Sequence, residues 1–262
     1  MSAVNFSALR KDFDLSGQAA VVTGGGRGIG LAIAAGLGLA GARVLIAGRK
    51  EETLRTASDA LSRQGVDCQW AQADVADEQS VLDLKREVME KLGKATCLVN
   101  CAGINPHYAY LEDTSTDEWR RVLSVNLNGV FYCSRHIGGT MLETGGGSII
   151  NISSLAGSVA LKRQTPYCAS KGGVEQFTKA LAFDWAERGV RVNAIAYGFV
   201  ETDLTAGVRG HDSITQRFLA RTPMARFGRL EETAAPAVFL ASPGAAFVTG
   251  ATIAVDGGWT SA

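Results

Sequence analysis

Residues 18–30 read Gln18-Ala-Ala-Val-Val-Thr-Gly-Gly-Gly-Arg-Gly-Ile-Gly30, and residues 31–40 continue as Leu-Ala-Ile-Ala-Ala-Gly-Leu-Gly-Leu-Ala. The apolar run that ends at Thr23 is typical of a buried parallel strand, and the apolar spacing after Gly30 is typical of a helix packed against it. A strand, a glycine turn and a helix can bind a diphosphate, because free N–H groups at the helix N-terminus face the anion. The alternative is an ordinary glycine-rich turn, since 31 of the 262 residues are glycine.

Strand-like and helix-like segments alternate along the rest of the chain. Strands are expected at 19–23, 43–47, 68–71, 97–100, 147–152, 191–194 and 252–255, and helices at 29–40, 51–64, 77–92, 116–138, 166–188 and 230–240. This alternation predicts an α/β fold: a single doubly wound Rossmann domain over 1–262, with a seven-stranded parallel sheet and helices on both faces. Residues 1–15 are expected to form a polar arm, and the irregular stretch 197–229 a substrate lid.

The composition narrows the possible partners. The chain has 26 basic and 26 acidic residues, so no charge excess favours nucleic acid or an acidic membrane. No apolar run reaches the ~18 residues of a membrane span and the N-terminus has no secretory pattern, which favours a cytoplasmic protein. The five cysteines are expected to be reduced core thiols, and the scattered histidines predict no metal site.

Tyr167 and Lys171 lie one helical turn apart in Tyr167-Cys-Ala-Ser-Lys171. An ordinary tyrosine has a pKa of about 10, and a neighbouring cation favours the phenolate that a general base requires. Upstream, a buried run leads into Ser153 and Ser154, whose hydroxyls are expected at the carboxyl end of a strand, where ligands bind in such sheets. The alternatives are a solvated Tyr–Lys pair and two capping or turn serines.

With these residues the chain resembles a classical short-chain dehydrogenase/reductase over nearly its whole length. Residues 23–30 match the family motif T-G-x-x-x-G-x-G, Asp74-Val75 resembles the adenine-contacting pair, and Asn100-Cys-Ala-Gly103 resembles the N-N-A-G turn. The resemblance implies a catalytic tetrad of Asn126, Ser154, Tyr167 and Lys171. It also implies that these residues bind the dinucleotide: Gly24, Gly26, Gly28, Ile29, Gly30, Asp74, Val75, Asn100, Ala102, Gly103, Tyr167, Lys171, Val200 and Thr202.

The roles implied by the family are those of hydride transfer between a nicotinamide and a carbonyl carbon. Tyr167 would exchange the proton, Ser154 would hydrogen-bond the oxygen, and Lys171 would lower the Tyr167 pKa and hold the ribose. Asn126 would order a water that leads from Lys171 to solvent. The rival class is a dinucleotide-binding regulator without turnover, but binding alone has no need of all four residues.

Two positions depart from the family pattern. Cys101 replaces the second asparagine of N-N-A-G, a mild change because backbone groups do much of the binding there. Tyr197 stands where the family has proline. This removes a fixed φ angle and adds an aromatic ring that could touch cofactor or substrate.

The residues after the second expected strand bear on the choice of cofactor. Gly48-Arg49-Lys50 offers no carboxylate to accept the ribose 2′-OH of NAD, whereas Arg49 would accommodate a 2′-phosphate. Arg27 in the glycine turn could add a second positive contact, and cations at the start of a helix make more sense facing an anion. The sequence predicts NADP(H) in preference to NAD(H), and neutralisation by Glu51 and Glu52 is the alternative.

Three segments are expected to line the substrate site: 104–108, 162–165 and 199–221. The candidates for substrate contact are Asn105, His107, Arg163 and His211. Such polar groups favour a hydroxylated or anionic small molecule.

Two further segments resemble one branch of the family. The stretches 163–173 and 221–228 are similar to sugar-acid and polyol enzymes, including gluconate 5-dehydrogenases. The alternative is a 3-oxoacyl thioester on a carrier protein, for which Arg209, Arg217 and Arg221 would supply a basic surface, or a general carbonyl compound.

The resemblance also implies a homotetramer. The helix expected at 166–188, with Gly172, Gly173, Val174, Phe177 and Leu181, and the segment 251–259 could be self-complementary surfaces. The alternative is that both are simply core.

Overall fold

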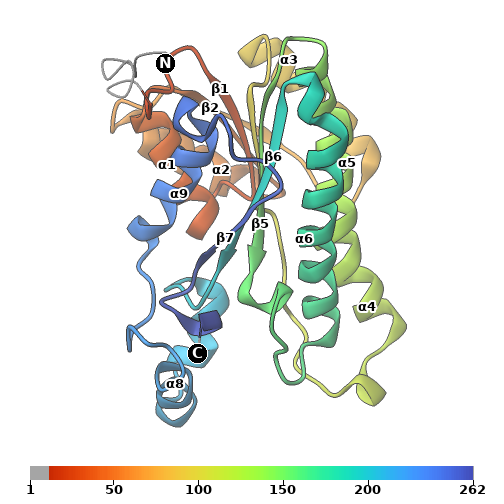
Figure 1. Ribbon diagram of the computed structural model, residues 1–262, viewed down its shortest axis with the longest axis vertical. Helices are drawn as coiled ribbons and strands as arrows, with labels where there is room; N and C mark the ends of the chain where they lie inside the picture. Colours follow the sequence, from red (N-terminus) through yellow and green to blue (C-terminus); the bar gives the residue numbers. More distant parts are fainter. Residues whose placement is uncertain (1–11, 262) are drawn as a thin grey trace, which may run out of the picture.

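The computed structural model describes residues 12–261 (Figure 1), so residues 1–11 of the expected arm lie outside the described part of the chain. Seven strands form one sheet in the order β3-β2-β1-β4-β5-β6-β7, and every neighbouring pair is parallel. The strand order reverses between β1 and β4. Ligands bind at such a switch point, beyond the carboxyl ends of the strands.

The predicted seven-stranded parallel sheet is confirmed, with most element bounds within a few residues of expectation. The strands are β1 (Ala19–Thr23), β2 (Arg43–Gly48), β3 (Cys68–Gln72), β4 (Cys97–Asn100), β5 (Gly147–Ser154), β6 (Val190–Tyr197) and β7 (Thr252–Val255). The longer helices are α1 (Gly28–Leu39), α2 (Glu51–Ser62), α3 (Glu78–Leu92), α4 (Thr116–Leu123), α5 (Gly129–His136), α6 (Thr165–Trp185) and α9 (Ala234–Ala241).

Alternate residues of the central strands face opposite helix layers. On β1, Ala20 and Val22 share a core with α1, α2 and α9, whereas Ala19 and Val21 share a core with α3, α5 and α6. Figure 1 shows these two layers on either side of the sheet. Because both faces of β1 are fully buried, its sequence is a continuous apolar run instead of an alternating one.

The expectation of one continuous helix over 116–138 is wrong. The segment Ser124–Asn128 forms a π-helical turn between α4 and α5, and the short 3₁₀ helix Gly138–Leu142 follows α5. In this turn Asn126 is fully buried, and its side chain binds the backbone of Ile104. One extra residue in a turn barely alters apolar periodicity, so the pattern could not reveal it, although such turns often occur at functional sites.

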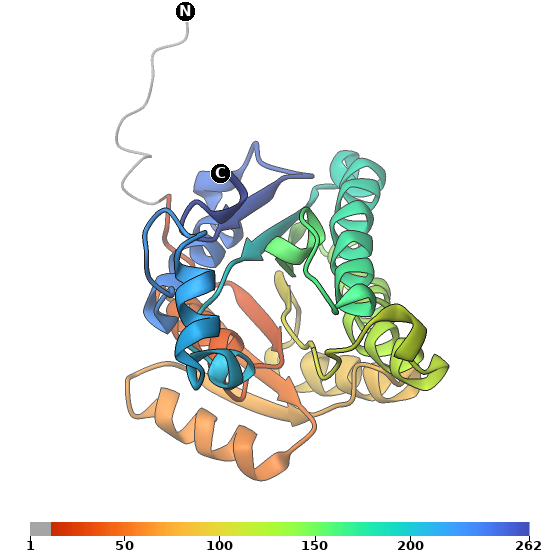
Figure 2. The same ribbon diagram turned by 90° about the horizontal axis from the view of Figure 1, so that it is seen from below.

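The irregular stretch 197–229 contains more order than its sequence indicates. Tyr197 still belongs to β6, and two short helices follow, α7 (Ala206–Arg209) and α8 (Asp212–Leu219). The Phe199 ring packs against Phe218 and Trp259 at centroid distances of 4.3 and 5.1 Å, which ties this stretch to the C-terminal segment. Figure 1 shows α8 beyond the carboxyl ends of the strands, and in Figure 2 this segment lies on the opposite side of the molecule from α4.

The described residues contain neither a membrane helix nor a metal cluster. No helix within 12–261 is long and apolar enough to span a bilayer. The same residues hold no group of three or more His, Cys, Asp or Glu side chains arranged to bind a metal ion. The five cysteines are free thiols, and burial raises the pKa of Cys97 and Cys133 to about 12.

Candidate active site

The glycine turn is joined to the end of β4 at the switch point. The Thr23 hydroxyl accepts hydrogen bonds from the N–H groups of Cys101 (3.1 Å) and Ala102 (3.2 Å). Gly24 has a φ of +68°, and a Cβ there would lie 2.9 Å from the Ala102 Cα, so only glycine fits. Sequence reasoning missed Thr23 as a site residue, although it opens the recognised motif. Since Cys101 contributes its N–H here, the loss of the usual asparagine leaves this link intact.

A second glycine brings the helix close to this turn. A Cβ on Gly30 would collide with the carbonyl oxygen of Gly24. The N-terminus of α1 therefore lies directly against the turn, and its free N–H groups face the region in front of it.

The side chain of Asn100 links two neighbouring strands of the sheet to the helices that cover them. Its Nδ2 donates to Asn151 Oδ1 (2.8 Å) and Ser134 Oγ (3.1 Å), and Asn151 in turn donates to Thr178 (2.9 Å). All four side chains are buried, and the network links β4 and β5 to α5 and α6. The Asn100 amide therefore serves the core.

Lys171 and Tyr167 lie beside the end of β5. Lys171 is 5 % exposed, its Nζ donates to the Ile152 carbonyl oxygen at 2.7 Å, and it lies 5.8 Å from the Tyr167 ring centroid. Ser154, the last residue of β5, lies close enough to the Tyr167 side chain for its hydroxyl to lower the pKa of the phenol. The structure therefore brings together the serine, tyrosine and lysine that the sequence predicted to work as a unit.

Burial shifts the pKa values of Tyr167 and Lys171. It raises the pKa of Tyr167 to about 12, the Ser154 hydrogen bond opposes the rise, and neighbouring Cys168 and Cys101 add to it. Burial also lowers the pKa of Lys171 from its ordinary 10.5 to about 8. The expectation that Lys171 sets a low Tyr167 pKa is thus wrong for this structure, because the ammonium points at a backbone carbonyl and desolvation of the phenolate dominates.

Asn126 lies next to Lys171 but binds backbone. Its Oδ1 accepts from the Ile104 N–H (2.8 Å), and its Nδ2 donates to the Ile104 carbonyl (2.9 Å) and to Ser170 (3.1 Å). A Cβ on Gly103 would lie 3.5 Å from Asn126 Oδ1 and 3.7 Å from Lys171 Nζ. The Asn126 side chain therefore fixes the loop that follows β4 against the Lys171 ammonium.

Two of the expected dinucleotide-binding residues, Thr202 and Asp74, make local hydrogen bonds. A Cβ on Gly28 would lie 3.9 Å from Thr202 Cγ2, so Thr202 faces the turn, where its N–H is held by Thr205 Oγ1 (3.1 Å). Asp74 Oδ1 accepts from the Ala76 N–H (3.0 Å) in a local turn.

Four other expected cofactor residues lie in well-defined contacts or turns. Val75 is buried against Gly129, Val200 pairs with Gly228, and Gly26 and Ile29 lie in the glycine turn and the first turn of α1.

The two arginines proposed to read a 2′-phosphate differ in their surroundings. Arg27 forms an exposed ion pair with Asp203 (2.9 Å), so it is engaged with the lid. Arg49 and Lys50 are exposed, and no ion pair within residues 12–261 involves either one or the adjacent Glu51 and Glu52. The neutralisation considered from the sequence is therefore absent in this part of the chain.

Two of the three expected substrate segments meet. Asn105 Nδ2 donates to Gln164 Oε1 (2.6 Å), and the Arg163 guanidinium stacks over Tyr110 and Tyr108 at 4.5 and 5.6 Å. Arg163 has a φ of +63°, an unusual backbone conformation for a side chain of its size. His211 is exposed on the third segment, next to α8, and makes no side-chain hydrogen bond to the other two segments.

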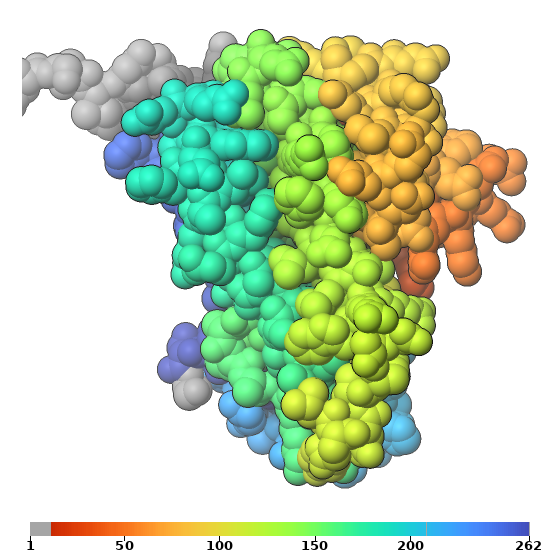
Figure 3. Space-filling view, turned by 90° about the vertical axis from the view of Figure 1, so that its right-hand side faces the viewer, coloured from red at the N-terminus to blue at the C-terminus, as the bar shows by residue number. Residues whose placement is uncertain are grey.

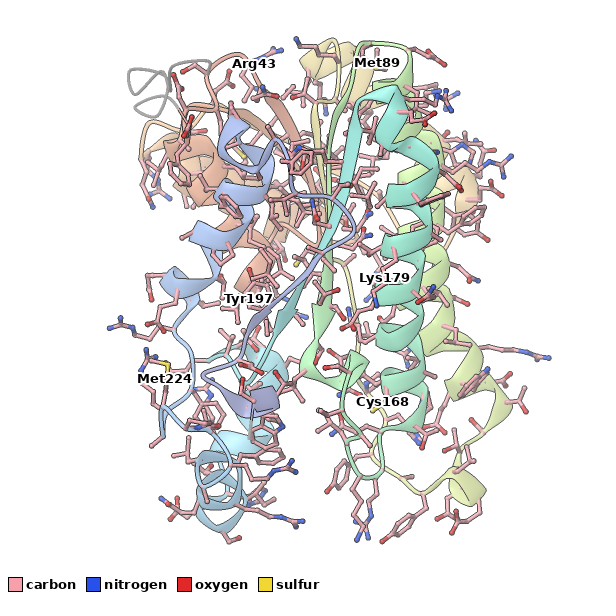
Figure 4. All side chains as sticks on the ribbon, in the orientation of Figure 1. Arg43, Met89, Cys168, Lys179, Tyr197 and Met224 are labelled. Atoms are coloured by element: carbon pink, nitrogen blue, oxygen red, sulfur yellow. The ribbon has the colours of Figure 1, made fainter. Side chains whose placement is uncertain are left out.

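Two expected contacts are corrected by the structure. His107 is 4 % exposed, and its ring nitrogens contact Thr114 (2.8 Å) and Glu118 (3.4 Å), so neither is free for a substrate. Tyr197 is buried, and its hydroxyl donates to the Thr233 carbonyl at 2.5 Å, so its ring fills the core and touches neither cofactor nor substrate. Figure 4 labels Tyr197 on the side of the sheet facing α9, and Cys168 near the lower end of α6.

Comparison with known proteins agrees with this geometry. A family model described as enoyl-(acyl carrier protein) reductase matches residues 24–260. The chain is 42 % identical to a galactitol 2-dehydrogenase (L-tagatose-forming) of Cereibacter sphaeroides, over 96 % of this chain and 98 % of that protein. It is 38 % identical to a gluconate 5-dehydrogenase of Gluconobacter oxydans, over 95 % and 96 %.

A solved structure shows that the fold is also similar in three dimensions. The gluconate 5-dehydrogenase of Burkholderia cenocepacia, in complex with NADP and tartrate, superposes with a TM-score of 0.93 at 38 % identity, covering 96 % of this chain and 98 % of that one. The fold and site define an NAD(P)-dependent oxidoreductase. The chain belongs to the short-chain dehydrogenase/reductase family.

The lowered pKa of Lys171 predicts a specific dependence of stability on pH. Between about pH 8 and 10.5 the unfolded chain holds a proton on this lysine that the folded protein lacks, so folding becomes more favourable as pH rises. Relative to Lys171→Met, the wild-type free energy of unfolding should rise by up to about 3 kcal/mol from pH 7 to pH 10.5.

Urea denaturation without dinucleotide at several pH values measures this difference. The control is Lys179→Met, an exposed position on the same helix, whose difference from wild type should stay constant with pH. A Lys171→Met difference that does not change with pH would contradict the buried ammonium.

Proposed function

We propose that the chain is an NADP(H)-preferring oxidoreductase that interconverts a secondary alcohol and a ketone, with Tyr167 as the general acid/base. The observation that carries this proposal is the convergence of Ser154, Tyr167 and Lys171 at the end of β5, next to the switch point between β1 and β4. The substrate is a small polar hydroxy compound such as a sugar acid or a polyol.

The residues divide the chemistry as follows. A bound nicotinamide dinucleotide would give or take the hydride, held by the glycine turn, Thr202 and Lys171. Tyr167 is protonated at neutral pH, so it can donate its proton to the oxygen of a ketone, while the Ser154 hydroxyl stabilises the charge on that oxygen. In the oxidation direction Tyr167 must accept a proton, and its raised pKa makes that direction faster at alkaline pH.

Replacement of Tyr167 tests this assignment. Tyr167→Phe should reduce kcat by at least ~10²-fold, because the proton donor is lost, while the affinity for the dinucleotide stays nearly unchanged. Steady-state kinetics and fluorescence titration measure the two quantities. Tyr132→Phe on α5 serves as the control, and normal turnover in Tyr167→Phe would refute the role.

The preference for NADP(H) is supported by the cations after β2. Arg49 and Lys50 have no ion-pair partner in the described residues and lie where the ribose 2′-position is recognised in this fold. Arg27 would join them only by leaving Asp203, an exchange that is cheap because the pair is exposed.

Substitution of Arg49 tests the cofactor proposal. Arg49→Ala should lower kcat/KM for NADP by about tenfold or more, since a charge-assisted contact is worth about 1.5–3 kcal/mol, and leave kcat/KM for NAD nearly unchanged. Arg63→Ala at the end of α2 is the matched surface control. Equal efficiency of the wild-type protein with NADP and NAD would overturn the preference.

The polar substrate class is supported by the groups at the rim. Asn105 Oδ1 and Arg163 Nε are buried without a hydrogen-bond partner, and such groups favour a ligand that supplies one. The lid over 197–229 would cover this substrate, with His211 as a further contact.

The second candidate, a 3-oxoacyl thioester, is favoured by the carrier-protein description of the matching family model. A carrier protein would need a basic surface at the mouth of the site. Two of the arginines expected to form it already make contacts within the chain, because Arg209 donates to the Thr202 carbonyl and Arg221 stacks on Trp259.

A substrate panel separates these candidates. Sugar acids, polyols, cyclic ketones and 3-oxoacyl thioesters are assayed by nicotinamide absorbance with both dinucleotides. We expect the highest kcat/KM with a sugar acid or polyol, and an increase in its KM of about tenfold in Arg163→Ala or His211→Ala. Unchanged KM in both variants would remove these residues from recognition, and activity confined to thioesters would overturn the polar substrate class.

We also propose a cytoplasmic homotetramer. Phe183 on α6 is 88 % exposed and Phe131 on α5 is 41 % exposed. Figure 3 shows the molecule from the side on which these two helices lie. Exposed aromatic rings on adjacent helices favour a self-complementary interface, although Val174 is buried within the chain and belongs to the core. The free cysteines support a reducing compartment.

Sedimentation at micromolar concentration should give the tetramer mass, and a monomer mass would contradict the proposed tetramer.

A further inference from the structure

Helix α6 makes a third contact with the end of β5 that the mechanism has not used. Glu175 Oε1 accepts a hydrogen bond from the Ser153 hydroxyl at 2.8 Å, and Ser153 is 3 % exposed. Glu175 lies one helical turn beyond Lys171, which binds the carbonyl of Ile152. Side chains at successive turns of one helix face therefore bind successive residues of the strand.

A third pair on the same helix also involves the end of the strand, but it does not continue this order. Tyr167 lies one turn before Lys171 and interacts with Ser154, the residue after Ser153. The position of Ser154 thus depends on how the preceding residue is held.

The backbone leaves room for the Glu175 carboxylate. A Cβ on Gly157 would collide with Glu175 Oε1 and would lie 2.9 Å from Ser153 Oγ. Gly157 ends the short 3₁₀ helix Leu155–Gly157 that follows β5, so the turn after the strand is shaped around this carboxylate. Any residue other than glycine would displace it.

The charge of Glu175 also reaches Lys171. The titratable groups that act on the ammonium are Cys101 at the end of β4 and Glu175 on α6, and Tyr167 lies beside it. Burial raises the pKa of Cys101 to about 11 and that of Tyr167 to about 12, so both are neutral at pH 7. Glu175 is therefore the negative charge among these groups that favours the protonated lysine.

We propose that Glu175 is a positioning residue, which fixes Ser153 and thereby Ser154, and which keeps the Lys171 ammonium charged under working conditions. This inference rests on the proposed function of Tyr167, Ser154 and Lys171. It assigns two separable effects, a hydrogen bond and a charge.

Two variants separate the effects. Glu175→Gln keeps an oxygen that accepts from Ser153 but removes the charge, so the alkaline limb of the kcat/KM profile for ketone reduction should move to lower pH by about half a unit to one unit. The loss should be roughly threefold or more at pH 8.5 and less than about twofold at pH 6.5. Ser153→Ala keeps the charge, so kcat should fall while the pH profile stays in place.

Glu187→Gln, near the end of α6, is the control for removal of a charge and should leave the profile unchanged. A wild-type pH profile in Glu175→Gln would overturn the proposal, whereas near-normal activity at pH 6.5 shows that the variant folds.

A stability measurement distinguishes this inference from the proposed function. The difference in unfolding free energy between Lys171→Met and its parent is followed against pH, in the wild-type and in the Glu175→Gln background. The pH midpoint of the rise in this difference should lie lower in the Glu175→Gln background, whether or not the protein turns over any substrate. If no substrate is turned over but the pH midpoint of the stability difference still shifts, only the proposed function is refuted. If Glu175→Gln leaves that pH midpoint unchanged, the proposed role of Glu175 is refuted.

Discussion

The hydrogen bond from the Lys171 ammonium to the Ile152 carbonyl, 2.7 Å long and buried, is the contact on which the site depends. It anchors α6 to the end of β5, and so sets where Tyr167 meets Ser154. Burial of the charge is costly, as the lowered pKa of Lys171 records. A lysine buried in this way makes the fold less stable, and we propose that it is retained for its role in the reaction.

Other buried side chains connect the glycine turn to the end of β5. Thr23 joins the glycine turn to the end of β4, and Asn100 joins β4 to β5 through Asn151. Asn126 then fixes the loop after β4 beside Lys171. Buried polar contacts therefore extend from the glycine turn toward Lys171, and each is made by a side chain that binds backbone or another buried amide or hydroxyl.

The sequence predicted the sheet and the main motifs because both are local patterns. A continuous apolar run marks a buried strand such as β1, and glycines at fixed spacing mark the turn after it. What it could not predict depends on partners far along the chain: the burial of Tyr197 against Thr233, the pairing of Arg27 with Asp203, and the contact of Glu175 with Ser153. No periodicity records which distant atom a side chain will meet.

The central claim is that this geometry transfers a hydride to or from a carbon that carries oxygen. The most direct measurement uses a polyol or sugar acid deuterated at the carbon to be oxidised, and follows the label after incubation with NADP. We predict that deuterium appears in the reduced dinucleotide and that the turnover shows a primary isotope effect. Reduction of the dinucleotide without the label, or no reduction with any alcohol at alkaline pH, would contradict it.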